Sequence, residues 1–357
     1  MSPGRVLRRL YDPWYASARH ALYRVNRRVP ILKTPLYVHW VATYECNLHC
    51  RHCEAGAGDK GPPPIDTETM ARAVTDMGRM GVRTLVVTGG EPLLRDDIFS
   101  VIGLARLCGV KKVYLATNGG PVTRRAAEIR RAGLDRVYVN LDGLEPAHNA
   151  LRGGPAAYKQ ALEALRFFKD IGVGERVVNS VIHPGNLDDI EALEESVRAA
   201  GATQWNIQTA VPLGRAKGMP GFELDPGRVV RLLEFLDGAR RRISLRIAEP
   251  PGYLGSWDRR LRPRPFYCGA GEEACSIMPD GEVLGCHVVY DSAYSAGNIG
   301  RESFASIWKR SRGRFKSPPA HSECRACPSR RSCRGGCWAM RQGARPCLLP
   351  PGRPGAR

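Results

Sequence analysis

Long hydrophobic runs and lysine are both scarce in this sequence of 357 residues. No stretch approaches the roughly 18 consecutive apolar residues of a membrane-spanning helix, so we expect neither a membrane span nor a membrane partner. The first 20 residues are basic but contain no continuous apolar segment, so we expect no secretory signal. These two absences predict a cytoplasmic protein.

Acidic residues are also scarce relative to basic ones. The chain has 45 arginines and 9 lysines against 35 acidic residues, which gives a formal net charge of +19. The arginines are scattered, and a nucleic-acid-binding protein would favour a basic stripe with interleaved aromatic residues, so we expect no nucleic-acid partner. Two interpretations stay open: a solvated arginine-rich surface without a role, or a field that attracts an acidic peptide or an anionic small molecule.

Hydrophobic residues make up 43% of the chain, enough for a sizeable core, and they fall into a β/α rhythm. We expect strands at 36–43, 84–88, 112–117, 136–141, 176–182 and 204–209, with helices at 67–80, 96–108, 123–132, 156–171 and 187–200. Strands that alternate with helices indicate parallel β–α–β units. Six such units predict an α/β fold, a partial (β/α)6 TIM-like barrel.

The pattern changes after residue 209. A helix at 226–241, a short strand at 244–247 and a segment rich in proline and arginine precede a cysteine-dense region. We expect four parts: a basic N-terminal extension (1–35), the barrel (36–250), a linker with a cysteine-rich module (251–347) and a disordered tail (348–357).

The first cysteine cluster lies directly after the first expected strand. Without export, the twelve cysteines are not expected to form disulfides. Cys46, Cys50 and Cys53 form C-x3-C-x2-C, and three thiolates without a fourth favour a cubane iron–sulfur cluster with one open iron. Barrel enzymes place their chemistry at such strand ends. A zinc site completed by His49 or His52 is the alternative.

The segment CNLHCRHC resembles the signature of the radical S-adenosylmethionine (SAM) superfamily, whose fold is a partial barrel. The resemblance implies a [4Fe–4S] cluster whose open iron binds SAM. It also implies one-electron cleavage of SAM to a 5′-deoxyadenosyl radical, which removes a hydrogen atom from the substrate.

Other strand ends resemble the SAM site of that family. By this resemblance, Gly89, Gly90 and Glu91 hold the amino group of SAM, Asn140 and Asp142 occupy ribose and substrate-side positions, Arg152 pairs with the SAM carboxylate, and His52 and Leu213 contact the adenine. From the residues alone, the GGEP segment could also be a turn before a helix.

Eight more cysteines lie between residues 268 and 347, enough for two cubane clusters or for a pair of zinc knuckles. Their spacing resembles the SPASM extension of radical SAM enzymes. This resemblance implies that Cys268, Cys275, Cys286 and Cys337 hold one auxiliary [4Fe–4S] cluster and that Cys324, Cys327, Cys333 and Cys347 hold another. The cysteine left over, Cys108, is expected to be a core residue, with a hydrogen-atom donor as the alternative.

Closed auxiliary clusters imply electron handling. A substrate radical that loses one electron and one proton becomes a product oxidised by two electrons, and a nearby base must take the proton. In sulfatase maturases of the family, an aspartate follows the third SPASM cysteine in this role. Here His287 stands at that position, either as the base or only as a hydrogen-bonding residue of the cluster loop.

Three hypotheses about function follow. The resemblance favours a radical SAM oxidoreductase that oxidatively modifies a ribosomally synthesised peptide or protein, with an external one-electron donor such as flavodoxin or ferredoxin. The alternative substrate is a small molecule: a sugar alcohol, an aminoglycoside or a cofactor-biosynthesis intermediate. A non-enzymatic iron–sulfur or zinc protein would leave Glu91 and Arg152 as coincidences.

Overall fold

A computed structural model describes residues 34–58, 63–248, 250–263, 266–343 and 347–349, and these residues form one nine-stranded sheet. The strands are β1 (Tyr37–Val41), β2 (Thr84–Thr88), β3 (Lys112–Thr117), β4 (Arg136–Asn140), β5 (Glu175–Ile182), β6 (Gln204–Thr209), β7 (Leu245–Ile247), β8 (Ala274–Ile277) and β9 (Val283–Leu284). Their order is β7-β6-β5-β4-β3-β2-β1-β8-β9, and the β8–β9 pair is antiparallel while the other pairs are parallel. The six expected barrel strands are confirmed, and the short strand after them extends the sheet as β7.

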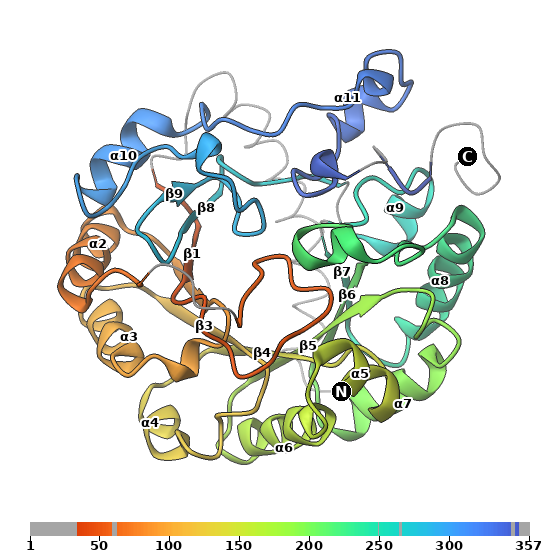
Figure 1. Ribbon diagram of the computed structural model, residues 1–357, viewed down its shortest axis with the longest axis horizontal. Coiled ribbons are helices and arrows are strands. Elements are labelled where there is room, and N and C mark those ends of the chain that lie inside the picture. Colours follow the sequence, from red (N-terminus) through yellow and green to blue (C-terminus); the bar gives the residue numbers. More distant parts are fainter. Residues whose placement is uncertain (1–33, 59–62, 249, 264–265, 344–346, 350–357) are drawn as a thin grey trace, which may run out of the picture.

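The helices lie around these strands, most of them in an outer ring (Figure 1). They are α2 (Thr67–Met80), α3 (Ile98–Leu107), α4 (Ala126–Arg131), α5 (Glu145–Arg152), α6 (Ala157–Asp170), α7 (Ile190–Ala199), α8 (Pro226–Ala239), α9 (Trp257–Leu261), α10 (Phe304–Ser311) and α11 (Arg330–Cys333). Asp66 caps α2 by accepting a hydrogen bond from the Thr69 amide at 2.6 Å. Helix α5 was not expected from the sequence, although Pro146 in its first turn and Gly153 after its last residue are typical end signals.

The two faces of the barrel strands differ in character. Along β4 and β6 every second side chain is buried, which is the period of a strand that covers a core with one face. Val137, Val139 and Trp205 belong to a large hydrophobic core that they share with the surrounding helices. The alternate residues, such as Asn140 and Asn206, are half-exposed and face the inside of the barrel.

The cysteine outside both predicted clusters lies where two outer helices meet. Cys108 ends α3, and a Cβ added to Gly78 of α2 would lie 2.1 Å from its carbonyl oxygen. The Cys108 thiol is 3.9 Å from the Thr75 hydroxyl and packs against the main core. This position, on the helix side of the sheet, agrees with a structural role for Cys108.

The C-terminal part of the chain continues the barrel sheet rather than standing apart from it. Strand β8 pairs with β1, with Cys275 opposite Val38 and Ser276 opposite His39. Helix α10 packs on α2, so the C-terminal segments close the ring beside the first barrel helix (Figure 1). The division near residue 250 stays a prediction, because strands from both sides of it share one sheet.

The structure describes little of the two expected terminal segments. Leu348 and Leu349 are buried, and the expectation of a disordered tail from residue 348 stays a prediction. Residues 1–33 of the expected N-terminal extension and residues 350–357 of the tail lie outside the described residues. None of the described helices is long and apolar enough to cross a membrane.

Candidate radical SAM and auxiliary-cluster sites

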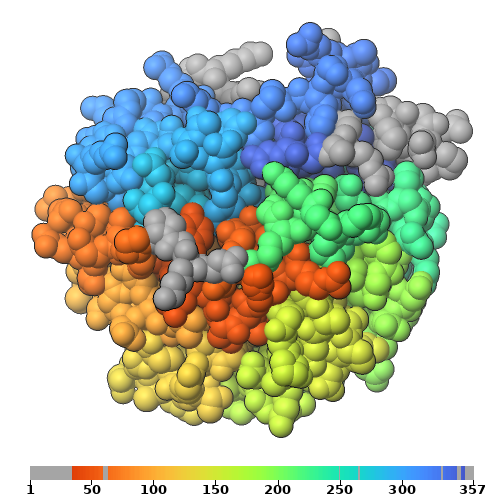
Figure 2. Space-filling model, in the orientation of Figure 1, coloured from red at the N-terminus to blue at the C-terminus, as the bar shows by residue number. Residues whose placement is uncertain are grey.

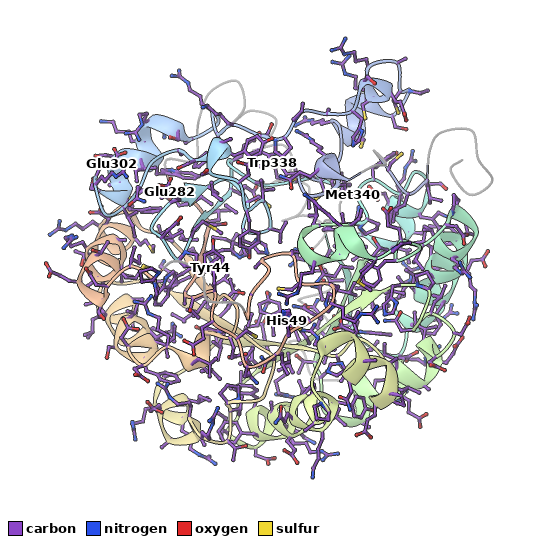
Figure 3. All side chains as sticks on the ribbon, in the orientation of Figure 1. Tyr44, His49, Glu282, Glu302, Trp338 and Met340 are labelled. Carbon is purple, nitrogen blue, oxygen red and sulfur yellow. The ribbon has the colours of Figure 1, made fainter. Side chains whose placement is uncertain are left out.

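The loop between β1 and α2 carries the first three cysteines. Figure 1 shows this loop inside the ring of helices, and in Figure 2 its residues occupy the middle of the same face of the molecule. Tyr44 and His49, labelled in Figure 3, lie near the centre of the ring. Cys46, Cys50 and Cys53 are free thiols, and Cys50 is buried. The sequence therefore places the triplet at the strand end where barrel enzymes carry their chemistry.

The three thiols of the triplet are electrostatic neighbours. Burial raises the pKa of Cys46 to about 11, and Cys50 and Cys53 add smaller contributions. Among the described residues, no three Cys, His, Asp or Glu side chains converge on a position for a single metal ion. The thiols that hold a cubane bind separate corner irons, so they need not converge on one point. Three cysteines on one loop fit the thiolate ligands of an iron–sulfur cubane.

Two glycines at the end of β2 allow the backbone to pack tightly against the start of the cluster loop. A Cβ on Gly90 would lie 2.3 Å from the Glu45 carbonyl oxygen, and a Cβ on Gly89 would lie 2.8 Å from that of Thr43. The amide of Gly90 donates to the Thr43 carbonyl at 2.7 Å. Both positions require glycine, and they couple the GGEP segment to the cysteine loop.

The carboxylate of Glu91 is fully buried and joins two strand ends. It accepts hydrogen bonds from the Thr117 hydroxyl at 2.9 Å and from the Asn118 and Leu93 amides at 2.8 and 3.1 Å. Burial outweighs these bonds and raises the pKa of Glu91 to about 7. Glu91 also caps the short helix at Pro92–Leu94, so GGEP does form a turn before a helix. A contact of Glu91 with SAM stays a prediction.

Asp142 and Arg152, predicted separately as SAM contacts, form a buried ion pair with each other. Nε and Nη2 of Arg152 both lie 2.6 Å from Oδ2 of Asp142, and Oδ1 accepts a hydrogen bond from the Val181 amide at 2.8 Å. Burial is the largest single effect and opposes ionisation of Asp142, but Arg152, followed by His52, His148 and the Val181 amide, together outweigh it and lower its pKa to about 2. On its other side, Nη1 of Arg152 is 3.9 Å from the Cys50 sulfur.

His52 and Leu213, the predicted adenine contacts, flank the same loop. His52 Nε2 lies 3.9 Å from Asp142 Oδ2, and its buried Nδ1 has no hydrogen-bond partner among the described residues. Burial and, to a smaller extent, Arg152 lower the pKa of His52 to about 4, so the ring is neutral at neutral pH. Leu213 is buried, and a Cβ on Gly214 would lie 2.3 Å from the Cys53 carbonyl oxygen, so the segment after β6 packs on the triplet.

Asn140 belongs to a row of asparagines on the inner face of the barrel. Asn179 of β5 lies opposite Asn140, and Asn206 of β6 lies opposite Asn179. Nδ2 of Asn206 donates to Oδ1 of Asn179 at 2.8 Å, while the buried Oδ1 of Asn206 has no hydrogen-bond partner within the described chain. Sequence reasoning missed Asn179 and Asn206. Their signal is a polar residue at an inward-facing position of a strand whose opposite face is apolar.

The thiols of the C-terminal part form two groups. In the first, a hydrogen bond with the Cys268 thiol, burial and the neighbouring Cys286 raise the pKa of Cys337 well above its usual range. In the second, burial raises the pKa of Cys347 to about 11, with contributions from Cys333, Cys327 and Cys324. These groups correspond to the two expected ligand sets, apart from Cys275.

Cys275 stands apart from the thiols with which it was expected to bind a cluster. It lies on β8 opposite Val38, on the strand face that belongs to the main hydrophobic core. Cys275 is fully buried, and burial alone raises its pKa, with no contribution from another thiol. Neighbouring thiols act on Cys337 but not on Cys275, although both belong to the main core, so the exclusion of Cys275 from the first auxiliary cluster is a prediction.

The loop after Cys286 reaches back over the inner face of β1 and β8. The ring of His287 stacks on that of His39 of β1, with centroids 4.2 Å apart and planes within 6°. Burial, followed by the nearby His287 and Arg246, holds the pKa of His39 well below its usual range. Farther along the loop, the Tyr290 ring lies 6.2 Å from that of Tyr44 in the cysteine loop. His287 is therefore held inside the barrel.

Tyr290 shows how close the two cysteine regions come. Burial raises its pKa well above the usual range, and Glu54, Cys53, Tyr44 and Cys286 add to this rise. Cys53 belongs to the first triplet and Cys286 to the C-terminal thiols. The tyrosine lies within electrostatic reach of both regions, so it links the first cysteine loop to the loop after Cys286.

Comparisons with known proteins agree with this geometry. Residues 40–197 match the model of the radical SAM superfamily, and residues 268–328 match the SPASM model, an iron–sulfur cluster-binding domain. The chain belongs to the radical SAM superfamily and carries a SPASM domain. As such, it binds a [4Fe–4S] cluster and SAM, together with auxiliary iron–sulfur clusters.

Curated relatives of this radical SAM protein include enzymes with different substrates. It is 27% identical over 322 residues to the AdoMet-dependent heme synthase of Nitratidesulfovibrio vulgaris, covering 84% of this chain and 86% of the relative. It is 29% identical over 323 residues to the mycofactocin maturase MftC of Mycobacterium ulcerans, covering 87% of this chain and 85% of the relative.

Solved structures share the fold. Streptococcus suis SuiB bound to S-adenosylmethionine aligns with a TM-score of 0.69 at 17% identity, over 92% of this chain and 79% of SuiB. Native anSMEcpe with bound AdoMet aligns with a TM-score of 0.68 at 21% identity, over 85% of this chain and 90% of anSMEcpe. The predicted partial barrel with a C-terminal SPASM module is confirmed.

Proposed function

We propose that this radical SAM protein oxidatively modifies a ribosomally synthesised peptide or protein. When bound, the first cluster and SAM supply a 5′-deoxyadenosyl radical that removes a hydrogen atom from the substrate. The observation that carries the oxidative outcome is His287, which follows Cys286 directly and is held inside the barrel by its stack on His39. A proton acceptor beside an auxiliary-cluster thiol allows a proton and an electron to leave the substrate at one place.

The cysteines divide into three ligand sets in this proposal. Cys46, Cys50 and Cys53 hold the SAM-binding cluster. Cys268, Cys286 and Cys337 hold the first auxiliary cluster, and Cys324, Cys327, Cys333 and Cys347 hold the second. The proximity of the thiols within each C-terminal group supports this division. An external one-electron donor such as flavodoxin or ferredoxin completes the system.

The SAM-contact residues position the cofactor between the strand ends. The amino group of SAM binds to Gly89, Gly90 and Glu91, and its carboxylate binds to the side of Arg152 that faces away from Asp142. Asn140 and Asp142 lie on the ribose side of SAM. His52 and Leu213 flank its adenine. The packing of GGEP and of the segment after β6 directly against the cysteine loop supports this arrangement.

Two observations favour a peptide substrate. Curated relatives include mycofactocin maturases, and SuiB, which shares the fold, has been solved bound to its precursor peptide SuiA. In addition, the net charge of +19 would attract an acidic peptide. The small-molecule alternative is favoured by one specific finding, the similarity to AdoMet-dependent heme synthases, which points to a cofactor-biosynthesis intermediate.

The substrate class is tested by anaerobic incubation of the reconstituted protein with SAM, reductant and either an acidic precursor peptide encoded beside its gene or an iron porphyrin precursor of heme. We expect the peptide to lose the mass of two hydrogen atoms as 5′-deoxyadenosine accumulates. Turnover of the porphyrin with an unchanged peptide would contradict the peptide proposal and support the alternative.

The ligand set of the first auxiliary cluster gives a second prediction. Cys275→Ala is expected to leave the iron content unchanged, because its side chain lies on the core face of β8 and no neighbouring thiol acts on it, unlike Cys337. The matched variant Cys286→Ala is expected to lower the iron content by up to about four atoms per chain, the content of one cubane. Iron and sulfide analysis after anaerobic reconstitution measures both. Equal losses in the two variants would restore Cys275 as a ligand.

A further inference from the structure

Arg152 is placed against the first cysteine loop by the helix that carries it. Helix α5 ends at Arg152, and the Arg51 amide of the cysteine loop donates to the Leu151 carbonyl at 2.8 Å. A Cβ on Gly153, the next residue, would lie 2.8 Å from the His49 carbonyl oxygen. The end of α5 therefore touches the backbone between Cys46 and Cys53, which places the Arg152 backbone beside the triplet.

Asp142 fixes the direction in which this guanidinium points. Its Oδ2 receives both Nε and Nη2 of Arg152 at 2.6 Å, and the Val181 amide holds its Oδ1. The Asp142 carbonyl in turn accepts a hydrogen bond from Asn186 Nδ2 at 2.8 Å. With one edge of the guanidinium bound to the carboxylate, Nη1 is directed to the Cys50 sulfur, 3.9 Å away.

The Asp142–Arg152 ion pair has no net charge, but its positive end lies nearer to Cys50, so the pair acts on this sulfur as an oriented dipole. The side chains of Arg152 and Asp142 are 9% and 0% exposed, so water screens their field only weakly. Arg152 Nη1 is the group of the pair that contacts the Cys50 sulfur. The positive end of the pair, with an N–H group, faces the sulfur.

We infer that the Asp142–Arg152 pair raises the reduction potential of the iron–sulfur cluster bound at Cys50, with Asp142 as the positioning residue. The inference rests on the proposed assignment of a cluster to the triplet. One-electron reduction adds a negative charge to the cluster, and a nearby buried cation stabilises the reduced form more than the oxidised form. Hydrogen bonds to cluster sulfurs act in the same direction. Arg152 thereby favours the electron uptake on which SAM cleavage depends.

The experiment replaces both charges and measures the potential without turnover. Arg152→Gln combined with Asp142→Asn removes the charges while keeping side chains that can hydrogen-bond. Reconstituted proteins are titrated anaerobically in the absence of SAM, with the reduced cluster followed by electron paramagnetic resonance. The signal of the first cluster is isolated by subtracting spectra of a variant in which Cys46, Cys50 and Cys53 are alanine.

We expect the ratio of reduced to oxidised first cluster to fall about tenfold at a given potential, which corresponds to a midpoint about 59 mV more negative for a one-electron couple. Arg152→Lys keeps a cation but loses the paired hydrogen bonds of the guanidinium with Asp142, so it should shift the midpoint potential in the same direction by a smaller amount. This variant gives a measurement even if the double variant does not fold. Arg136→Gln is the matched control, because it removes a partly buried, ion-paired arginine from the opposite end of β4.

Wild-type midpoints in the double variant and in Arg152→Lys, at full iron content, would overturn the inference while leaving the proposed function intact. A shift of the same size in Arg136→Gln would also overturn it, because any lost arginine would then have the effect. Wild-type protein that takes up no cluster at the triplet would instead overturn the proposed function, and the inference with it.

Discussion

Replacing Cys46, Cys50 and Cys53 together by alanine is expected to abolish SAM cleavage and to lower the bound iron from about twelve to about eight atoms per chain. The SAM-binding cluster loses its ligands, whereas the C-terminal thiols lie on other segments and keep theirs. The loop itself is anchored by backbone hydrogen bonds, such as that from Arg51 to Leu151, which alanine leaves in place. The measurements are iron analysis and chromatography of 5′-deoxyadenosine after anaerobic reduction.

Cys108→Ala is the control for this triple variant. Cys108 lies between α2 and α3, against Gly78, and is expected to bind no iron. Its replacement should leave both iron content and SAM cleavage at wild-type levels. Continued 5′-deoxyadenosine formation by the triple variant would refute the role of the triplet. Iron content that stays at about four in the wild type would refute the auxiliary clusters.

The barrel and the triplet could be predicted because their signals are local. Alternating apolar residues define strands such as β4 and β6, and their buried faces match the main core. The spacing of Cys46, Cys50 and Cys53 is read directly along one loop. Helix α5 was not predicted because eight residues give only about two turns of apolar periodicity, although Pro146 and Gly153 mark its two ends.

Contacts between residues that are distant in the sequence could not be predicted from the order of residues along the chain. The sequence marks Asp142 and Arg152 as polar candidates, but their mutual ion pair depends on where α5 docks. In the same way, β8 joins the barrel beside β1, and this register turns Cys275 into the core while Ser276 faces inward beside His39. The spacing of cysteines along the sequence gives the number of candidate ligands, whereas strand register decides which thiols lie close enough to bind one cluster.

The second large effect is expected at His287. Substitution of His287 by glutamine removes a proton acceptor but keeps a polar side chain of similar size. We expect product formation to fall about 10²- to 10⁴-fold, the usual contribution of a general base, while substrate-dependent formation of 5′-deoxyadenosine continues. Hydrogen abstraction does not need the imidazole, but loss of the proton from the substrate does. The measurement is the ratio of modified product to 5′-deoxyadenosine.

His39→Phe is the matched variant for this prediction, because it keeps an aromatic ring beneath His287 but removes the only other imidazole of the stack. Burial and its neighbours hold the pKa of His39 well below its usual range, so His39 is a weak base and is not expected to take the proton of the substrate. We therefore expect His39→Phe to keep most of the product yield. A loss as large as that of His287→Gln would move the proton-accepting role to His39, and a full yield from His287→Gln would leave His287 with a structural role in the cluster loop.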